Sequence, residues 1–155
     1  MTTSLKNGPP FLLERKNKMY IFPTEEQINH LHNTVLLEGG AKGVRLINGV
    51  STILGTCQMA SDYQKLTVGE TAILLMEKIV SGHIFTDGNK RTGGACFLLF
   101  LSLNGWEFCG NVEDIAKYIV NQSKGVKISD TLSEKCQIST LTQILFKYDK
   151  GEWTP

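Results

Sequence analysis

Apolar residues recur every three or four positions between residues 24 and 38, which predicts an amphipathic helix over Thr24 to about Glu38. Its apolar stripe consists of Ile28, Leu31, Val35 and Leu36. Thr24 and Gln27 have the spacing of a capping box at its start. The pair Gly39-Gly40 ends it, because glycine adopts the backbone conformation that commonly terminates helices.

Two further segments are predicted to be apolar helices, and the first of them suits the centre of a helical bundle. The first covers Thr67 to about Gly82, where apolar side chains occupy most of the circumference. The second runs from about Lys90 to Leu103 and stops at Asn104-Gly105. Neither is long enough to span a bilayer, and the polar N-terminal residues lack the apolar run of a signal peptide.

The remaining pattern adds short elements around these helices. Residues 41–49 read as a loop or short hairpin, and residues 19–22 as a short strand or an extended anchor. Further helices are expected over residues 50–58, from an N-cap at Asn111 to about residue 122, and over residues 139–148. The sequence therefore predicts an all-α fold of five to seven short helices, without the strand–helix alternation of nucleotide-binding α/β folds.

Composition narrows the class of protein. The chain has 155 residues, 41% of them apolar and 20% charged, which suits one globular domain. A formal charge of +1 gives no general attraction for nucleic acid, and nothing in the chain suggests membrane binding. The four cysteines are far apart and include no C-x-x-C pair, so we expect no zinc ribbon and a cytoplasmic protein with reduced thiols.

The most unusual run of residues joins the two apolar helices: His83-Ile84-Phe85-Thr86-Asp87-Gly88-Asn89-Lys90-Arg91. Its two cations fall in the first turn of a helix, where the backbone N–H groups already create a positive field. That combination favours an anion such as a polyphosphate. A nearby aspartate can hold Mg²⁺ together with phosphate oxygens, and a histidine can take a proton from an attacking hydroxyl. A buried histidine followed by an ordinary loop and a capped helix would also explain these residues.

The same run resembles the signature of the Fic/Doc (fido) family, H-x-F-x-D/E-G-N-x-R, at every defining position. The residues from Phe97 to Trp106 also resemble the helix that follows this signature. The resemblance implies a fido-type helical bundle with at most a short β-hairpin flap. It divides the chain into an N-terminal lead-in (1–21), a core domain (22–121) and a C-terminal helical extension packed on the same domain (122–155).

The resemblance also implies roles for the site. His83 would be the general base for a Ser, Thr or Tyr hydroxyl of a protein substrate, and Phe85 would anchor the loop in the core. Asp87 would coordinate Mg²⁺. Four more residues would bind the phosphates of ATP or another nucleotide: Gly88, Asn89, Lys90 and Arg91. Arg91 would also stabilise the charge that develops during transfer.

At one position the chain departs from the pattern of the family's adenylyltransferases, and this difference bears on the reaction. Adenylyltransferases of the family carry a second arginine three residues after the first, where this chain has Gly94. Together with Lys90, this favours the Doc (death-on-curing) branch, which transfers the γ-phosphoryl group. We therefore expect a Doc-like toxin, with translation elongation factor as the leading target and an antitoxin as partner. The alternatives are transfer of AMP and a catalytically idle module that binds a phosphorylated ligand or a partner.

Weaker features each allow a structural explanation. Thr34 to Gly39 fits the family's inhibitory pattern S/T-x-x-x-E-G/N, which would make Glu38 inhibitory, but an ordinary helix end is favoured because Gly94 replaces the arginine with which such a glutamate pairs. Gly93-Gly94 suits either close approach of a nucleotide or tight helix packing. Arg45 belongs either to a substrate-positioning flap or to a solvated loop.

Two further features of the sequence favour a structural role. His30 and His32 point to different helix faces, which argues against a shared metal site. Cys96 is interpreted as a small core residue.

Overall fold

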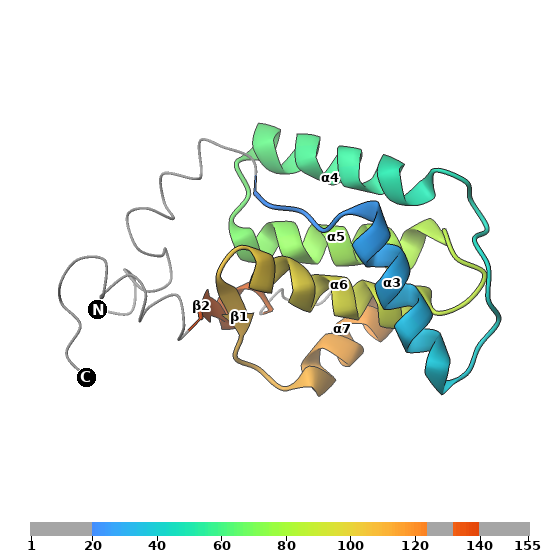
Figure 1. The fold of residues 1–155 in the computed structure, drawn as a ribbon. Helices are drawn as coiled ribbons and strands as arrows, with labels where there is room; N and C mark the ends of the chain where they lie inside the picture. The colour runs from blue at the N-terminus through green and yellow to red at the C-terminus, as the bar shows by residue number, and fades with distance from the viewer. Residues whose placement is uncertain (1–19, 124–131, 140–155) are drawn as a thin grey trace, which may run out of the picture.

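A computed structural model describes residues 20–123 and 132–139 (Figure 1). Its helices are α3 (Glu25–Val35), the 3₁₀ turn η2 (Leu36–Glu38), α4 (Gly49–Gln64), α5 (Val68–Gly82), α6 (Asn89–Leu103) and α7 (Val112–Ser123). The 3₁₀ turn η3 (Ser133–Lys135) and two strands, β1 (Trp106–Phe108) and β2 (Cys136–Ile138), complete the described part. The predicted all-α fold is confirmed. No helix in these two ranges is both long and apolar enough to cross a membrane.

Helix α5 forms the centre of the bundle. It packs against α6, α4 and α7, and Figure 1 shows α4, α5 and α6 side by side, with α3 crossing α6. Its apolar side chains are buried around most of the circumference, as the sequence predicted. The main core cluster draws on each α-helix from α3 to α7, and its largest fully buried side chains include Phe85, Phe97 and Phe100. The loop between α5 and α6 is therefore fixed at both ends by the best-packed helices.

The starts of α3 and α5 follow from their capping residues. Thr24 accepts a hydrogen bond from the backbone N–H of Gln27, whose side chain accepts one from the N–H of Thr24. Thr67 and Glu70 form the same reciprocal pair at α5. The capping box expected at Thr24 is confirmed, and each box satisfies two backbone donors that the helix itself leaves open.

Helix α4 is longer than predicted. The sequence predicted a helix over residues 50–58, whereas α4 continues to Gln64. Its last buried residue is Ser61, whose hydroxyl lies 2.7 Å from that of Thr71 on α5. Because a polar pair replaces an apolar contact there, the hydrophobic pattern fades two turns before the helix ends.

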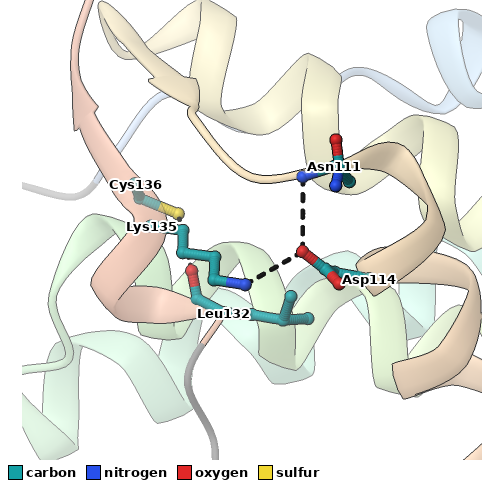
Figure 2. Close-up of polar contacts among 5 residues, drawn as sticks. All are labelled: Asn111, Asp114, Leu132, Lys135 and Cys136. Carbon is teal, nitrogen blue, oxygen red and sulfur yellow. Dashed lines mark hydrogen bonds and ion pairs between the residues drawn. The ribbon is translucent and has the colours of Figure 1, made fainter.

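A two-stranded antiparallel sheet follows α6, with Trp106 opposite Ile138 and Phe108 opposite Cys136. Figure 2 shows how the returning segment is tied to α7: Lys135 Nζ lies 2.9 Å from Asp114 Oδ2, which also accepts a hydrogen bond from the N–H of Asn111 at 3.3 Å. Helix α7 starts directly after Asn111, as predicted. The predicted helix over residues 139–148 lies outside the described residues except for Ser139, which is not helical.

The segment before α3 is an anchor rather than a strand. Asn104, which is 5% exposed at the end of α6, accepts from the N–H of Ile21 at 2.9 Å and donates to the Ile21 carbonyl at 2.8 Å. The hydroxyl of Tyr20 donates to the Leu66 carbonyl at 2.9 Å. Residues 20–22 are thereby fixed across the bundle without pairing to a strand. The proposed boundaries at residues 21 and 122 stay a prediction.

Candidate active site

The candidate site lies on the loop from His83 to Gly88, and both ends of this loop have left-handed backbone conformations. His83 ends α5 with φ 48° and ψ 41°, and its side chain is exposed. Gly88 precedes α6 with φ 82° and ψ 13°. A left-handed conformation is uncommon for a residue other than glycine and is found disproportionately at functional sites. The fold therefore uses strained backbone at His83 to turn the chain out of α5.

Phe85 and Asn89 close the loop on itself. The Asn89 side chain accepts a hydrogen bond from the N–H of Phe85 at 3.1 Å and donates one to its carbonyl at 2.9 Å. The Phe85 ring, the predicted loop anchor, is 1% exposed. Because one amide satisfies both backbone groups of a buried residue, the loop keeps a single shape without regular structure.

Asp87 holds an exposed carboxylate in a fixed orientation. Its Oδ1 accepts from the N–H of Gly88 at 2.8 Å, and its Oδ2 accepts from the N–H of Ala41 at 3.2 Å. These two backbone hydrogen bonds, Gly88 first, lower the pKa of Asp87, and the charges of Arg91 and His32 act in the same direction. The carboxylate is therefore ionised at neutral pH, and it has the hard oxygen ligands that Mg²⁺ prefers.

The N-terminus of α6 differs from those of α3 and α5. Its N-cap is Gly88, which offers no side-chain hydrogen bond, and its first turn contains no acidic residue. That turn instead carries Lys90 and Arg91, both exposed. Open backbone N–H groups and two cations at one helix start favour a bound anion.

Arg91 also reaches across to α3. Its Nη1 donates to the carbonyl of Val35 and its Nη2 to that of Gly39, both at 2.9 Å. These carbonyls lie where α3 and η2 end, so the guanidinium satisfies acceptors that the helix leaves open. Two of its five N–H donors are used in this way, and the others can still meet a phosphate.

Residues 41–47, called the flap below, pair with the candidate site. The N–H groups of Arg45 and Leu46 donate to the Ile84 carbonyl at 2.7 and 3.1 Å, and that of Thr86 donates to Gly43 at 3.0 Å. Within the described chain this segment has no strand pair of its own. It makes one isolated bridge, Val44 to Phe85, in place of a hairpin.

Comparison with known proteins matches the sequence of this chain to a family. A family model described as Fic/DOC family matches residues 22–101. The chain is also 30% identical over 113 residues to the protein kinase doc of Escherichia phage P1, an alignment that covers 69% of this chain and 89% of that relative. The chain belongs to the Fic/Doc family. The matched region runs from two residues before Thr24, the N-cap of α3, into the last turn of α6, and it contains the whole loop.

Within this Fic/Doc domain the two neighbouring glycines of α6 have different surroundings. A Cβ atom on Gly93 would lie 2.7 Å from Val80 Cγ2 and 3.1 Å from the Met76 carbonyl oxygen, so this glycine allows α5 and α6 to pack closely. A Cβ on Gly94 would make ordinary contacts with Ile119 and Ile115. Tight packing therefore explains Gly93 and leaves Gly94 open to another role.

Gly94 lies on a groove of about 530 Å³ between the end of α3, α6 and α7. The lining is mostly apolar, including Leu98, Val112 and Ile119. Lys90 and Arg91 belong to the same lining, so the basic start of α6 continues directly into an apolar groove. This arrangement suits a ligand with an anionic end and an apolar or flat body.

The sequence did not indicate that His32 belongs to the site. His32 lies on α3, is 3% exposed, and contacts the loop at the Asp87 carbonyl. His30 is exposed, in agreement with the prediction that the two histidines face different directions. The detectable signal was a polar residue four positions after Ile28, on the buried side of α3.

Two further predictions have different outcomes. Cys96 is fully buried, and burial raises the pKa of its thiol to about 12, which confirms a core residue rather than a nucleophile. The side chain of Glu38 lies outside the described part of the structure, so its inhibitory role stays a prediction. Among the residues described, no three His, Cys, Asp or Glu side chains form a cluster that could hold a metal.

Proposed function

We propose that this protein transfers the γ-phosphoryl group of ATP to a Ser, Thr or Tyr hydroxyl of a protein substrate. The observation that carries the proposal is the loop–helix junction, where an ionised, exposed Asp87 adjoins the uncapped, basic start of α6. The phage relative named a protein kinase supports phosphoryl transfer as the reaction. Gly94, in place of a second arginine, agrees with the same choice.

In this proposal His83 is the general base. The target hydroxyl gives its proton to the His83 imidazole while its oxygen bonds to the γ-phosphorus, and the bond from that phosphorus to the β–γ bridging oxygen breaks to release ADP. The left-handed backbone at His83 fixes where the exposed ring leaves α5. General bases contribute about 10²–10⁴-fold to rate, so removing the imidazole should cost that much.

The other loop residues would stabilise the negative charge of the phosphates during transfer. The backbone at Gly88 and Asn89, with the side chains of Lys90 and Arg91, would bind phosphate oxygens and oppose the charge of transfer. Asp87 would hold Mg²⁺, and the donor set fits because this ion commonly takes one or two carboxylates together with substrate phosphates. When bound at Asp87, Mg²⁺ would neutralise part of the negative charge of the phosphates.

The groove beside Lys90 and Arg91 would take the nucleoside. Its volume of about 530 Å³ falls within the range of small-molecule sites, and its apolar lining suits a flat base. A bulky side chain at Leu98, as in Leu98→Trp, should then raise the KM for ATP more than it lowers kcat. An unchanged KM would place the nucleoside elsewhere.

Parallel reactions with α- and γ-labelled ATP test the reaction type. We expect γ label alone on protein, and mass spectrometry should show added phosphate rather than added AMP. His83→Ala should remove the transfer, whereas His30→Ala, which changes an exposed histidine of α3, should retain it. Label from the α position would support adenylyl transfer instead. Equal transfer by wild type and His83→Ala would exclude His83 as the base, and no transfer by the wild type would leave a binding module as the explanation.

The cellular role extends this proposal. As a Doc-like toxin acting in the cytoplasm, the protein would modify a translation elongation factor and be held inactive by an antitoxin. Expression of the wild type should then slow translation, and His83→Ala should not. If Glu38 inhibits the enzyme in cis, Glu38→Gly should raise the transfer rate, and an unchanged rate would assign that glutamate to the helix end alone.

A further inference from the structure

His32 is the one buried histidine in the described part of the chain, and its ring contacts the loop that carries the candidate site. It lies in the last turn of α3, and its side chain points into the bundle rather than to solvent. A buried polar side chain needs a partner to offset the loss of its hydration. The groups that His32 contacts therefore indicate its role.

The first partner is the backbone of Asp87. His32 Nε2 lies 2.7 Å from the Asp87 carbonyl oxygen. A carbonyl oxygen can only accept, so Nε2 must carry the proton and donate it. This hydrogen bond fixes the peptide plane that follows Asp87, and that plane leads directly into Gly88 and the start of α6.

The second partner is the ring of Phe85. The two rings stack with centroids 3.7 Å apart and planes 8° from parallel. The imidazole also packs beside Gly88, because a Cβ placed there would lie 3.5 Å from His32 Cδ2. One side chain from α3 thus supports Phe85, Asp87 and Gly88 together.

These contacts restrain the main chain that carries the Asp87 carboxylate. Its two oxygens are oriented by the N–H groups of Gly88 and Ala41, but Ala41 belongs to the flap and is exposed. The hydrogen bond from His32 comes instead from a buried position on a capped helix. The main chain at Asp87 is therefore set by α3, although α3 contributes no residue to the family signature.

We propose that His32 is a positioning residue, which holds the Asp87 carboxylate and the start of α6 in the arrangement that binds Mg²⁺ and nucleotide phosphates. This rests on the proposed use of Mg²⁺ and a nucleotide at the loop. His32 does not touch either ligand and acts through the main chain of Asp87. Residues that orient a metal-binding carboxylate in this way typically change metal affinity or activity by about 10–100-fold when replaced.

Two substitutions separate the hydrogen bond from the stacking. His32→Phe retains a flat ring against Phe85 and removes the donor to Asp87. His32→Gln removes the ring and retains a donor, because the Gln amide nitrogen can occupy the place of Nε2. His30→Phe is the matched control, since it makes the same change at an exposed histidine of the same helix.

The decisive measurement is ADP affinity by calorimetry, with Mg²⁺ and with EDTA, alongside thermal unfolding of each variant. We expect His32→Phe to reduce the Mg²⁺-dependent gain in ADP affinity by about 10–100-fold and to change affinity in EDTA much less. His32→Gln should recover a substantial part of that gain, and His30→Phe should match the wild type. A purely structural role would instead lower both affinities equally and in step with the unfolding temperature.

Several outcomes would overturn the positioning role. They are equal losses with and without Mg²⁺, a His32→Phe variant that matches the wild type, or a wild type whose ADP affinity does not respond to Mg²⁺. The assay needs no phosphoryl transfer, so the two proposals can fail separately. A wild type that shows the His32 effect but transfers no phosphate contradicts the proposed function alone.

Discussion

The adjacent glycines of α6 should respond in opposite directions to the same substitution. In a helix interior, Gly→Ala stabilises by about 1 kcal/mol through backbone entropy. At Gly94 the new methyl group meets Ile119 Cδ1 at 3.5 Å and Ile115 Cγ2 at 3.7 Å, which are ordinary contacts. Gly94→Ala should therefore raise the free energy of unfolding by about 1 kcal/mol, and the unfolding temperature by about 2–4 °C for a chain of this size.

At Gly93 the same methyl group has no room. It would lie 2.7 Å from Val80 Cγ2 and 3.1 Å from the Met76 carbonyl oxygen, and the second of these is backbone that cannot rotate away. Overpacking of this kind costs about 1–3 kcal/mol. After the gain in helix propensity, Gly93→Ala should be about 0–2 kcal/mol less stable than the wild type.

The most informative quantity is the difference in the free energy of unfolding between the two variants. Both changes lie in the same helix at neighbouring positions, so the propensity gain nearly cancels and the difference reports packing alone. Urea unfolding followed by far-ultraviolet circular dichroism should place Gly94→Ala above Gly93→Ala by about 1–3 kcal/mol. Equal stabilities, or the reverse order, would refute the packing explanation of Gly93.

Three other predictions test separate parts of the structure. Tyr118→Phe should lower the free energy of unfolding by about 1.5–3 kcal/mol in urea titrations, because the Tyr118 hydroxyl donates to the Glu77 carboxylate between α7 and α5; an unchanged midpoint would contradict that contact. A thiol reagent should modify exposed Cys109 in the native protein and reach Cys57, Cys96 and Cys136 only after unfolding, so rapid native labelling of a second thiol would refute their burial. Because the pKa of Asp87 is lowered on folding, its ionised form stabilises the protein above the unfolded pKa, and this contribution is lost as the pH falls through the lowered value. Asp87→Asn should accordingly be less stable than the wild type at neutral pH, with a difference in urea midpoint that shrinks below about pH 4; a difference independent of pH would exclude the shift.

The sequence predicted the helices whose buried faces are apolar, because hydrophobic periodicity reports burial directly. It predicted α3, α5, α6 and α7 to within one or two residues, apart from the 3₁₀ turn that ends α3. It failed at the end of α4, where Ser61 is buried by pairing with Thr71, and polar contacts of that kind leave no periodic signal. Asn104 was similarly taken for a helix stop, although its side chain also holds the N-terminal segment in place.

The candidate site also has one part that the sequence predicted and one part that only the structure shows. Its signature residues are contiguous, so the sequence alone identified them and the junction of the two apolar helices on which they lie. The supporting contacts come from α3 and the flap, and only the tertiary structure decided them: His32 with the Asp87 carbonyl, Ala41 with the Asp87 carboxylate, and Arg91 with the Val35 carbonyl. Each joins residues 46 to 56 positions apart and uses a main-chain atom on one side. Every residue has such atoms, so no choice of side chain along the sequence reveals which of them will meet.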